Sequence, residues 1–195
     1  MDWSILSIPA RGPLFEGAIA VYAEAFARPP YSDPDRGSEI RQRIRETHSL
    51  RPGFRLLVAC VGRERVVGMA YGYHGSNGQW WHDTVVKALN PLEAADWLGD
   101  SYELVEIAVH PAMQGNGIGA GLIGELLRPC REATCVLSTR TDSDAHRLYR
   151  RLGFEEIIEM AFTTGGYPFY VMGKRLRPES GKRDGSPGAG TLSNG

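Results

Sequence analysis

A glycine-rich loop is the part of the sequence whose residue types and spacing most clearly suggest chemistry. It runs Gln114-Gly115-Asn116-Gly117-Ile118-Gly119-Ala120-Gly121, after a predicted strand and into a predicted helix. Glycine lets the backbone turn tightly and approach a ligand closely, while the first amides of a helix and its positive dipole end favour a phosphate group. The pattern therefore predicts a pyrophosphate site. The alternative is that the glycines let the helix pack closely on a sheet.

The loop lacks the marks of two common nucleotide-binding motifs. No Gly-Lys-Ser/Thr ending follows the glycines, which excludes a nucleoside triphosphate P-loop. A dinucleotide motif could be sought in residues 119–124, but these lie inside the predicted helix. The next strand ends Ser138-Thr139-Arg140 without a carboxylate for a ribose hydroxyl. A dinucleotide site is therefore disfavoured.

Three short segments of the second half occur in an order and spacing that resemble a known family. They are Glu106-Ile107-Ala108-Val109-His110-Pro111, then Gln114-x-x-Gly117-x-Gly119, then Ala145-x-x-Leu148-Tyr149-x-x-Leu152-Gly153-Phe154. Each motif is weak alone, but the set resembles the GNAT-type N-acetyltransferases, which use acetyl-CoA. The match covers residues 102–154 closely, and the order of strands and helices on either side agrees with it.

The resemblance implies a binding site for acetyl-CoA as co-substrate. In the family, the Gln-x-x-Gly-x-Gly amides hold the CoA pyrophosphate, and the preceding strand binds the pantetheine arm and polarises the thioester carbonyl. The residues so implied are Ile107, Ala108, Val109, Gln114, Gly115, Asn116, Gly117, Ile118, Gly119 and Ala120. Asp142 departs from the pattern, because the family often has an asparagine there whose amide can donate to pantetheine. A carboxylate can cap the helix but cannot make that donation.

The resemblance also implies catalytic residues. Tyr149 is the family's usual acid for the departing thiolate, and a phenol with a pKa of about 10 is protonated at neutral pH. The alternative is a packing tyrosine on an amphipathic helix. The amine must lose a proton before it attacks, and Glu103 and Glu106 lie on the strand beside the cofactor. Their spacing predicts opposite faces, so that at most one points into the cleft. We favour Glu106, against the alternative of a solvated or salt-bridged carboxylate.

The acceptor side is predicted from aromatic and acidic residues. The segment 74–100 is too long for an ordinary connection and contains Trp80, Trp81 and Trp97. With Tyr71, Tyr73 and Tyr102 it could form an aromatic surface, for which Tyr73, Trp81 and Tyr102 are the candidate substrate-binding residues. Acidic residues near this surface would favour a small cationic amine as acceptor. They are Asp83, Glu93, Asp96, Asp100, Glu103 and Glu106. The tryptophans could equally complete a local core.

The pattern of apolar residues gives the elements that must position these groups. Strands are predicted at 3–8, 55–61, 66–73, 102–109, 134–139, 156–162 and 169–173, and helices at 13–27, 38–49, 117–127 and 142–152. Weak helical spacing occurs at 84–89 and 92–98. We therefore expect one α/β (α+β) domain over residues 1–176, with a mixed, mostly antiparallel sheet of about six to seven strands flanked by helices on both faces. Residues 177–195 are predicted to be a disordered tail.

Composition excludes several other classes of protein. The 195 residues carry a formal net charge of -1, which gives no general attraction to nucleic acid or anionic membrane. Cys60, Cys130 and Cys135 have no metal-binding or disulfide spacing, and the five histidines show no ligand cluster. We read the cysteines as reduced thiols and expect no metal. No signal sequence or membrane segment is recognised, so a cytoplasmic protein is expected.

The sequence thus predicts an N-acetyltransferase that transfers acetyl from acetyl-CoA directly to a primary amine, with a protein or peptide amine as a further acceptor class. One alternative is a non-catalytic acyl-CoA sensor or interaction module, which would not depend on Tyr149 or the glutamates. Another is an enzyme acting on aminoacyl-tRNA, for which Arg147, Arg150 and Arg151 could form a local patch. The net charge argues against nucleic acid, and a homodimer is left open.

Overall fold

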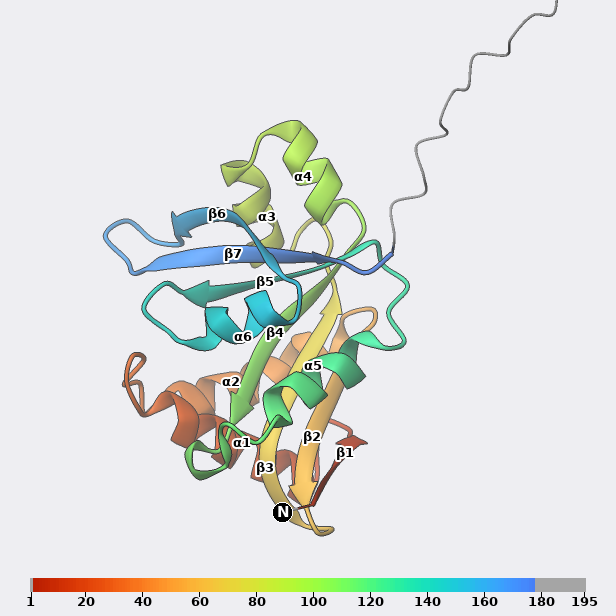
Figure 1. Ribbon diagram of the computed structural model, residues 1–195, viewed down its shortest axis with the longest axis vertical. Coiled ribbons are helices and arrows are strands. Elements are labelled where there is room, and N and C mark those ends of the chain that lie inside the picture. Colours follow the sequence, from red (N-terminus) through yellow and green to blue (C-terminus); the bar gives the residue numbers. More distant parts are fainter. Residues whose placement is uncertain (1, 178–195) are drawn as a thin grey trace, which may run out of the picture.

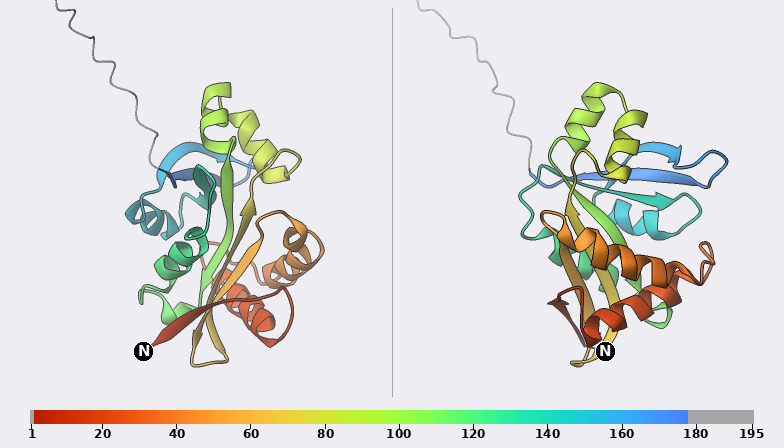
Figure 2. Two further views of the ribbon diagram at one scale, coloured as in Figure 1. Left: turned by 90° about the vertical axis from the view of Figure 1, so that its right-hand side faces the viewer. Right: turned by 180° about the vertical axis from the view of Figure 1, so that it is seen from behind.

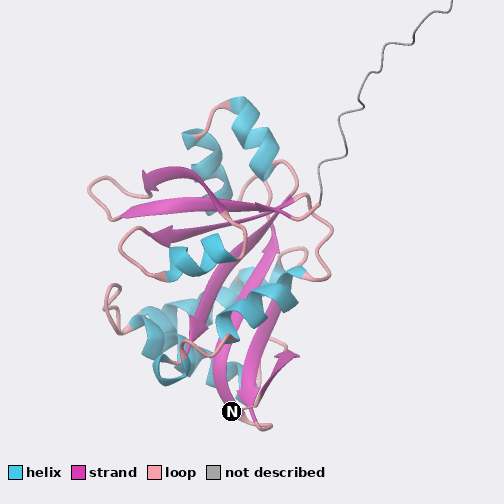
Figure 3. Cartoon of the chain, viewed as in Figure 1, coloured by secondary structure: helices cyan, strands magenta, loops and turns pink. Residues whose placement is uncertain are grey.

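The computed structural model describes residues 2–177, which fold around one seven-stranded sheet (Figures 1 and 3). The strands are β1 (Trp3–Ser7), β2 (Arg55–Val61), β3 (Arg65–His74), β4 (Ser101–Val109), β5 (Thr134–Arg140), β6 (Glu155–Ala161) and β7 (Pro168–Arg175). Their order across the sheet is β1-β2-β3-β4-β5-β7-β6, and every pairing is antiparallel except β4 with β5. The predicted mixed, mostly antiparallel sheet is confirmed.

Helices cover both faces of this sheet. They are α1 (Pro13–Phe26), α2 (Arg36–Glu46), α3 (Trp80–Ala88), α4 (Pro91–Leu98), α5 (Ile118–Leu127) and α6 (Ala145–Arg151), with short 3-10 turns at His48–Leu50 and Pro111–Met113. Figure 2 shows α1 and α2 on one face and α5 and α6 on the other. No helix within residues 2–177 is long and apolar enough to cross a membrane. Nearly all of the predicted tail lies outside the described residues.

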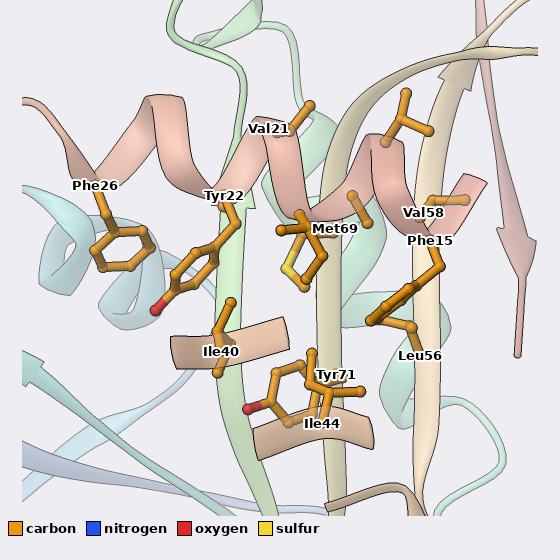
Figure 4. Packing of buried hydrophobic residues seen from close by; sticks show 14 of the residues in the cluster. Phe15, Val21, Tyr22, Phe26, Ile40, Ile44, Leu56, Val58, Met69 and Tyr71 are labelled. Atoms are coloured by element: carbon orange, nitrogen blue, oxygen red, sulfur yellow. The ribbon is translucent and has the colours of Figure 1, made fainter. Parts of the chain in front are cut away.

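The first helix anchors the face on which the candidate acceptor residues lie. Pro13 occupies the first turn of α1, where its missing N–H costs nothing. The buried side of α1 packs on β2 and β3, where Phe15 and Tyr22 meet Leu56, Met69 and Tyr71 (Figure 4). The next helix, α2, covers this cluster with Ile40 and Ile44 and leaves its arginines outside the core.

The parallel pairing in the middle of the sheet is short. β4 pairs with β5 only from Ser101 to Glu103, opposite Thr134 to Val136. Beyond Glu103 the two strands diverge, and β4 continues to Val109 with β3 as its one partner among the described residues (Figure 1). Backbone N–H and C=O groups on the β5 side of residues 104–109 therefore face an opening between the two halves of the sheet.

A β-bulge in β4 changes which way the two predicted glutamates point. Glu103 pairs with Tyr73 and Glu106 pairs with Tyr71. The two glutamates are three positions apart on β4, whereas the two tyrosines are only two positions apart on β3. The extra residue lies around Val105, where the register shifts. Since directly paired residues share a face, both carboxylates lie on the face of Tyr71 and Tyr73. The expectation of opposite faces is wrong, because strict alternation along a strand does not hold through a bulge.

The segment from 74 to 100 is a pair of helices that covers the second half of the sheet. Val85 of α3 and Trp97 and Leu98 of α4 pack on Val136 of β5 and Val171 of β7. Trp97 is buried and stacks on the guanidinium of Arg175, so the core alternative is correct for this tryptophan. Asn90 begins α4 with a capping box that includes Glu93.

Candidate active site

A cleft of about 1440 Å³ opens where β4 and β5 diverge. We call the part lined by the glycine-rich loop and α6 the cofactor half, and the part lined by α2 and α3 the acceptor half. The α1–α2 connection also lines the cleft. The middle is the stretch from Glu103 to Val109, which includes Ile107 and Ala108. The predicted cofactor residues and the two glutamates thus share one continuous space.

The glycine-rich loop presents a row of free backbone amides to the cleft. Gly115 and Gly117 both have φ near +78°, which turns the chain so that α5 begins directly after Gly117. Within the described chain, none of the amides from Gly115 to Ala120 donates a hydrogen bond to a protein acceptor. A Cβ on Gly115 or Gly117 would meet no atom within 4 Å. An open cradle of amides at a helix N-terminus fits a pyrophosphate.

Polar side chains hold this loop in shape. The Gln114 amide donates to the Val109 carbonyl at 3.3 Å, and the Asn116 amide donates to the Met113 and Gln114 carbonyls at 3.1 Å. The packing alternative holds for Gly121, since a Cβ there would lie 2.5 Å from the Trp3 ring. The first glycines therefore serve the cradle, and Gly121 serves the contact between α5 and β1.

Tyr149 lies in the wall of the cleft on α6. Its ring is buried edge-to-face against Phe154 at 5.8 Å. Burial raises the pKa of the Tyr149 phenol, with smaller contributions from Tyr31 and Glu106. The phenol therefore stays protonated throughout the neutral range and can donate to a thiolate.

Glu103 is a buried carboxylate without a complete set of partners. Its side chain is 3% exposed, and its Oε2 has no hydrogen-bond partner in the described structure. Burial raises its pKa to about 8; the charge of Arg51 opposes this rise and the charge of Glu106 adds to it. A carboxyl that titrates near neutral pH in a cleft is suited to accept a proton.

Glu106 is held differently. Its carboxylate lies 3.6 Å from the Arg36 guanidinium, which also donates to the Tyr22 hydroxyl at 2.7 Å. Burial raises the pKa of Glu106, while Arg36 and Tyr22 counter that rise by stabilising the ionised form. Glu106 is thus a paired charge beside Glu103.

Several cleft residues were missed by the sequence reasoning. Tyr31 lies between the guanidinium groups of Arg36 and Arg140, at 5.2 and 5.4 Å from its ring, and so joins the α1–α2 connection to the end of β5. Arg43, His48 and Arg51 line the acceptor half of the cleft. The Arg-rich face of the second predicted helix was the available signal. Its register against β4 could not be read from the sequence.

The predicted acceptor residues fall into two groups. Tyr73 and Trp81 line the cleft, and the Trp81 indole donates to the Ser138 hydroxyl at 3.0 Å. Tyr102 does not: it is buried in the cluster beneath α5, and its hydroxyl faces the Gly53 carbonyl. The expectation that Tyr102 faces an acceptor is therefore corrected. Its neighbour Glu103 occupies the cleft face, and adjacent residues of a strand point to opposite faces.

The expected acidic surface is also corrected. Asp83, Glu93, Asp96 and Asp100 do not line the cleft. Asp96 pairs with Arg175, Asp100 with Arg177, and Asp83 accepts from the Gly78 amide. Only the two glutamates of β4 bring negative charge to the acceptor half, where they face arginines.

Asp142 lines the cofactor half of the cleft, but Arg140 occupies its carboxylate through two hydrogen bonds of 2.9 and 2.6 Å. Arg140 in turn stacks on the Tyr167 ring at 3.5 Å. The three cysteines are free thiols and none of them lines the cleft. Residues 2–177 contain no group of three potential metal ligands.

Comparison with known proteins identifies the family. The model of the acetyltransferase (GNAT) family matches residues 18–154, which include the cradle, both glutamates and Tyr149. The chain belongs to this family. The region matched by the GNAT model contains both the amide cradle and the point where β4 and β5 diverge.

Two relatives from Mycobacterium tuberculosis carry acetyltransferase names. The GCN5-like protein acetyltransferase Rv2170 is 38% identical over 122 residues, which are 57% of this chain and 59% of that protein. The N-alpha-acetyltransferase RimI is 47% identical over 57 residues, which are 29% of this chain and 36% of that protein. Each match spans less than two thirds of the relative's length.

Solved structures agree on the fold of this GNAT chain. The structure described as histone acetyltransferase HPA2 and related acetyltransferase, from Corynebacterium glutamicum, has a TM-score of 0.63 and 21% identity. The match covers 92% of this chain and 99% of that one. At this identity the likeness shows the fold alone.

Proposed function

We propose that this GNAT protein is an N-acetyltransferase that moves an acetyl group from acetyl-CoA directly to a primary amine. The observation that carries the proposal is the single cleft that joins the free amides of 115–120 to the buried carboxylate of Glu103. Acetyl-CoA would place its pyrophosphate on these amides and its pantetheine arm along Ile107 to Val109, beside the divergence from β5. The acceptor would enter from the α2 and α3 side.

Glu103 is proposed as the general base in place of Glu106. An acceptor amine is an ammonium ion in neutral water, and it must pass a proton to a base to free its lone pair. Glu106 is paired with Arg36, which lowers its affinity for a proton, whereas Glu103 has an unpartnered oxygen and a pKa of about 8. Glu106 would keep its charge and raise the proton affinity of Glu103.

The chemistry then proceeds in two bond changes. The free amine attacks the thioester carbonyl carbon, and a C–N bond forms as the carbonyl oxygen takes up negative charge. Free amides of β4 beside the opening are suited to stabilise that oxygen. The C–S bond then breaks, the sulfur leaves as a thiolate, and the Tyr149 phenol gives it a proton. The nitrogen, which became positively charged on attack, returns one proton to the Tyr149 phenolate and becomes a neutral amide, and Glu103 releases its proton to solvent.

A non-catalytic acyl-CoA sensor would also use the cradle, but it would have no use for Glu103. A buried carboxylate with an unpartnered oxygen destabilises the fold. A nucleic-acid acceptor is less supported, since Arg147 pairs with Asp144 and Arg150 with Glu156. A cytoplasmic location and a homodimer, which the sequence leaves open, are not tested by the structure.

The proposal is tested by binding and then by turnover. Calorimetry and thermal shift with acetyl-CoA, CoA and NADP come first, followed by CoA thiol release against a panel of amines. We expect stabilisation by acetyl-CoA and CoA and thiol release with at least one amine. Binding of acetyl-CoA without release on any amine would favour the sensor, and stabilisation by NADP alone would refute the assignment of the cradle.

A further inference from the structure

Two arginines that line the acceptor half of the cleft form no salt bridge among the described residues. Arg43 projects from α2, and Arg51 follows the 3-10 turn at His48–Leu50; both line the cleft. Within residues 2–177, neither guanidinium makes a salt bridge or a side-chain hydrogen bond. Their neighbours on α2 differ, because Arg41 and Arg45 both pair with Glu16. Arg43 and Arg51 are thus available to a ligand.

These two charges lie close to the proposed base. The charge of Arg51 lowers the pKa of Glu103, and its guanidinium lies over the Tyr73 ring, 4.5 Å from the ring centre. The charge of Arg43 lowers the pKa values of Glu106 and His48. His48 is buried, lies 3.0 Å from the Tyr71 hydroxyl, and has a pKa lowered to about 3 by burial and by both arginines. The pocket around the base is therefore positively charged at one side, with a neutral histidine beneath it.

The CoA phosphates do not account for these arginines. Val109 lies six positions beyond Glu103 on β4, and the chain then turns to the cradle. At about 3.3 Å per residue this is about 20 Å of strand. Arg51 lies at the Glu103 end, so a pyrophosphate on the amides of 115–120 is out of its reach. An anion bound by Arg43 and Arg51 would therefore belong to the acceptor.

Part of the cleft wall is aromatic. Trp80 is 64% exposed and lies 5.6 Å from the Phe162 ring, which in turn meets Phe169 at 5.3 Å. All three line the cleft beside Trp81. A large aromatic side chain left exposed at a cleft mouth is a common feature of ligand contact.

We propose that the acceptor is an α-amino acid with an apolar side chain, whose carboxylate is bound by Arg43 and Arg51 while its amine meets Glu103. The inference rests on the proposed function and adds the substrate class to it. A carboxylate next to the amine suits two guanidinium groups beside one base. The side chain of such an acceptor would lie on the wall of Trp80 and Phe162. This replaces the small cationic amine expected from the sequence.

Acceptors that differ only in the carboxylate measure how much this group contributes to turnover. CoA release would be measured with phenylalanine, phenylalanine amide and 2-phenylethylamine at saturating acetyl-CoA, and with the leucine series likewise. We expect kcat/KM for the acid to exceed that for its amide by at least about ten-fold. The amide has the less basic amine and deprotonates more readily, so amine basicity cannot produce this preference.

Arginine variants then locate the recognition. Arg43→Gln and Arg51→Gln should each raise KM for the acid by about ten-fold, with KM for the amide changed less than about three-fold. Arg41→Gln removes a charge from the same helix outside the cleft and is the matched control, for which no change is expected. KM for acetyl-CoA should stay the same in all three variants.

The outcomes distinguish this inference from the proposed function. Turnover of amides or simple amines at least as fast as of the acids would support the acetyltransferase and overturn the carboxylate site. Equal effects of Arg41→Gln and the two cleft variants would overturn it as well, since a general charge effect would then suffice. If no member of these series releases CoA while another amine of the wider panel does, the inference is overturned and the proposed function stands. If no amine of the wider panel releases CoA either, both are refuted.

Discussion

The titration of Glu103 gives the sharpest prediction for the proposed mechanism. Burial raises its pKa to about 8, with Arg51 opposing and Glu106 adding to the shift. A general base acts only when ionised, and a group with this pKa is about one tenth ionised at pH 7 and about nine tenths at pH 9. We therefore expect kcat to rise about ten-fold between these two pH values, with a midpoint near pH 8.

Two substitutions test the origin of this pH dependence. Glu103→Gln removes the base and should lower kcat by about 10²- to 10⁴-fold, and the rise centred near pH 8 should disappear. Glu106→Gln should keep the rise but move it to lower pH, because the charge of Glu106 raises the pKa of Glu103. The assay is CoA thiol release at saturating acetyl-CoA and acceptor, from about pH 6 to about pH 10.

The acceptor is itself an ammonium ion and supplies the necessary control. Two acceptors whose amines differ in pKa should give the same midpoint in kcat, since Glu103 belongs to the protein. A midpoint that follows the pKa of the acceptor would refute the assignment of the base. So would a Glu103→Gln variant that keeps both its rate and its rise near pH 8.

Three further predictions concern the cradle, the acid and the buried charge. Gly117→Ala places a side chain at φ +77° and should raise KM for acetyl-CoA about ten-fold, with a loss of about 1 kcal/mol in stability. The control Gly124→Ala lies inside α5 in open space, so it should leave KM unchanged and stabilise the protein by about 0.5–1 kcal/mol. Tyr149→Phe should lower kcat by about 10²-fold or more while calorimetry shows the same affinity for acetyl-CoA; an unchanged kcat would remove the acid role. Glu103→Gln should also stabilise the protein. The folded pKa of about 8 lies above the ordinary 4.5, so the unfolded chain binds fewer protons between these values and the wild type loses stability as pH rises through them. Thermal unfolding should show a gain of the order of 3 kcal/mol at most at pH 7 and none near pH 4, and an equal gain at both would contradict the buried charge.

The elements of the fold could be predicted from local pattern alone. Proline at the start of α1 and the alternation in β2 and β3 are signals that neighbouring residues carry, and the structure places those elements at the expected residues. The second predicted helix, 38–49, is instead a helix from Arg36 to Glu46 followed by a 3-10 turn. Its arginine-rich face gave few apolar positions from which to fix its ends.

The candidate site was predicted well where one segment makes it and poorly where several meet. The cradle depends on consecutive residues, so glycine spacing was enough to find the free amides of 115–120. Tyr102 was assigned wrongly and Trp97 was left undecided, because their residue types suggest ligand contact equally well as core packing. Arg51 carried no signal, since its place beside Glu103 arises from the packing of the turn after α2 against β3 and β4.

The bulge in β4 explains why two carboxylates here can act as one unit. It turns Glu106 to the same face as Glu103, so that a negative charge on one carboxyl makes ionisation of the other less favourable. Arg36 lies close to Glu106 and favours its ionised form. When the pair of carboxyls binds one proton, that proton is therefore on Glu103. On strict alternation one carboxylate would face the cluster beneath α5, and neither the coupling nor a base that titrates near pH 8 would follow. The extra residue around Val105 is therefore part of the proposed catalytic arrangement, although its own side chain supplies no proton.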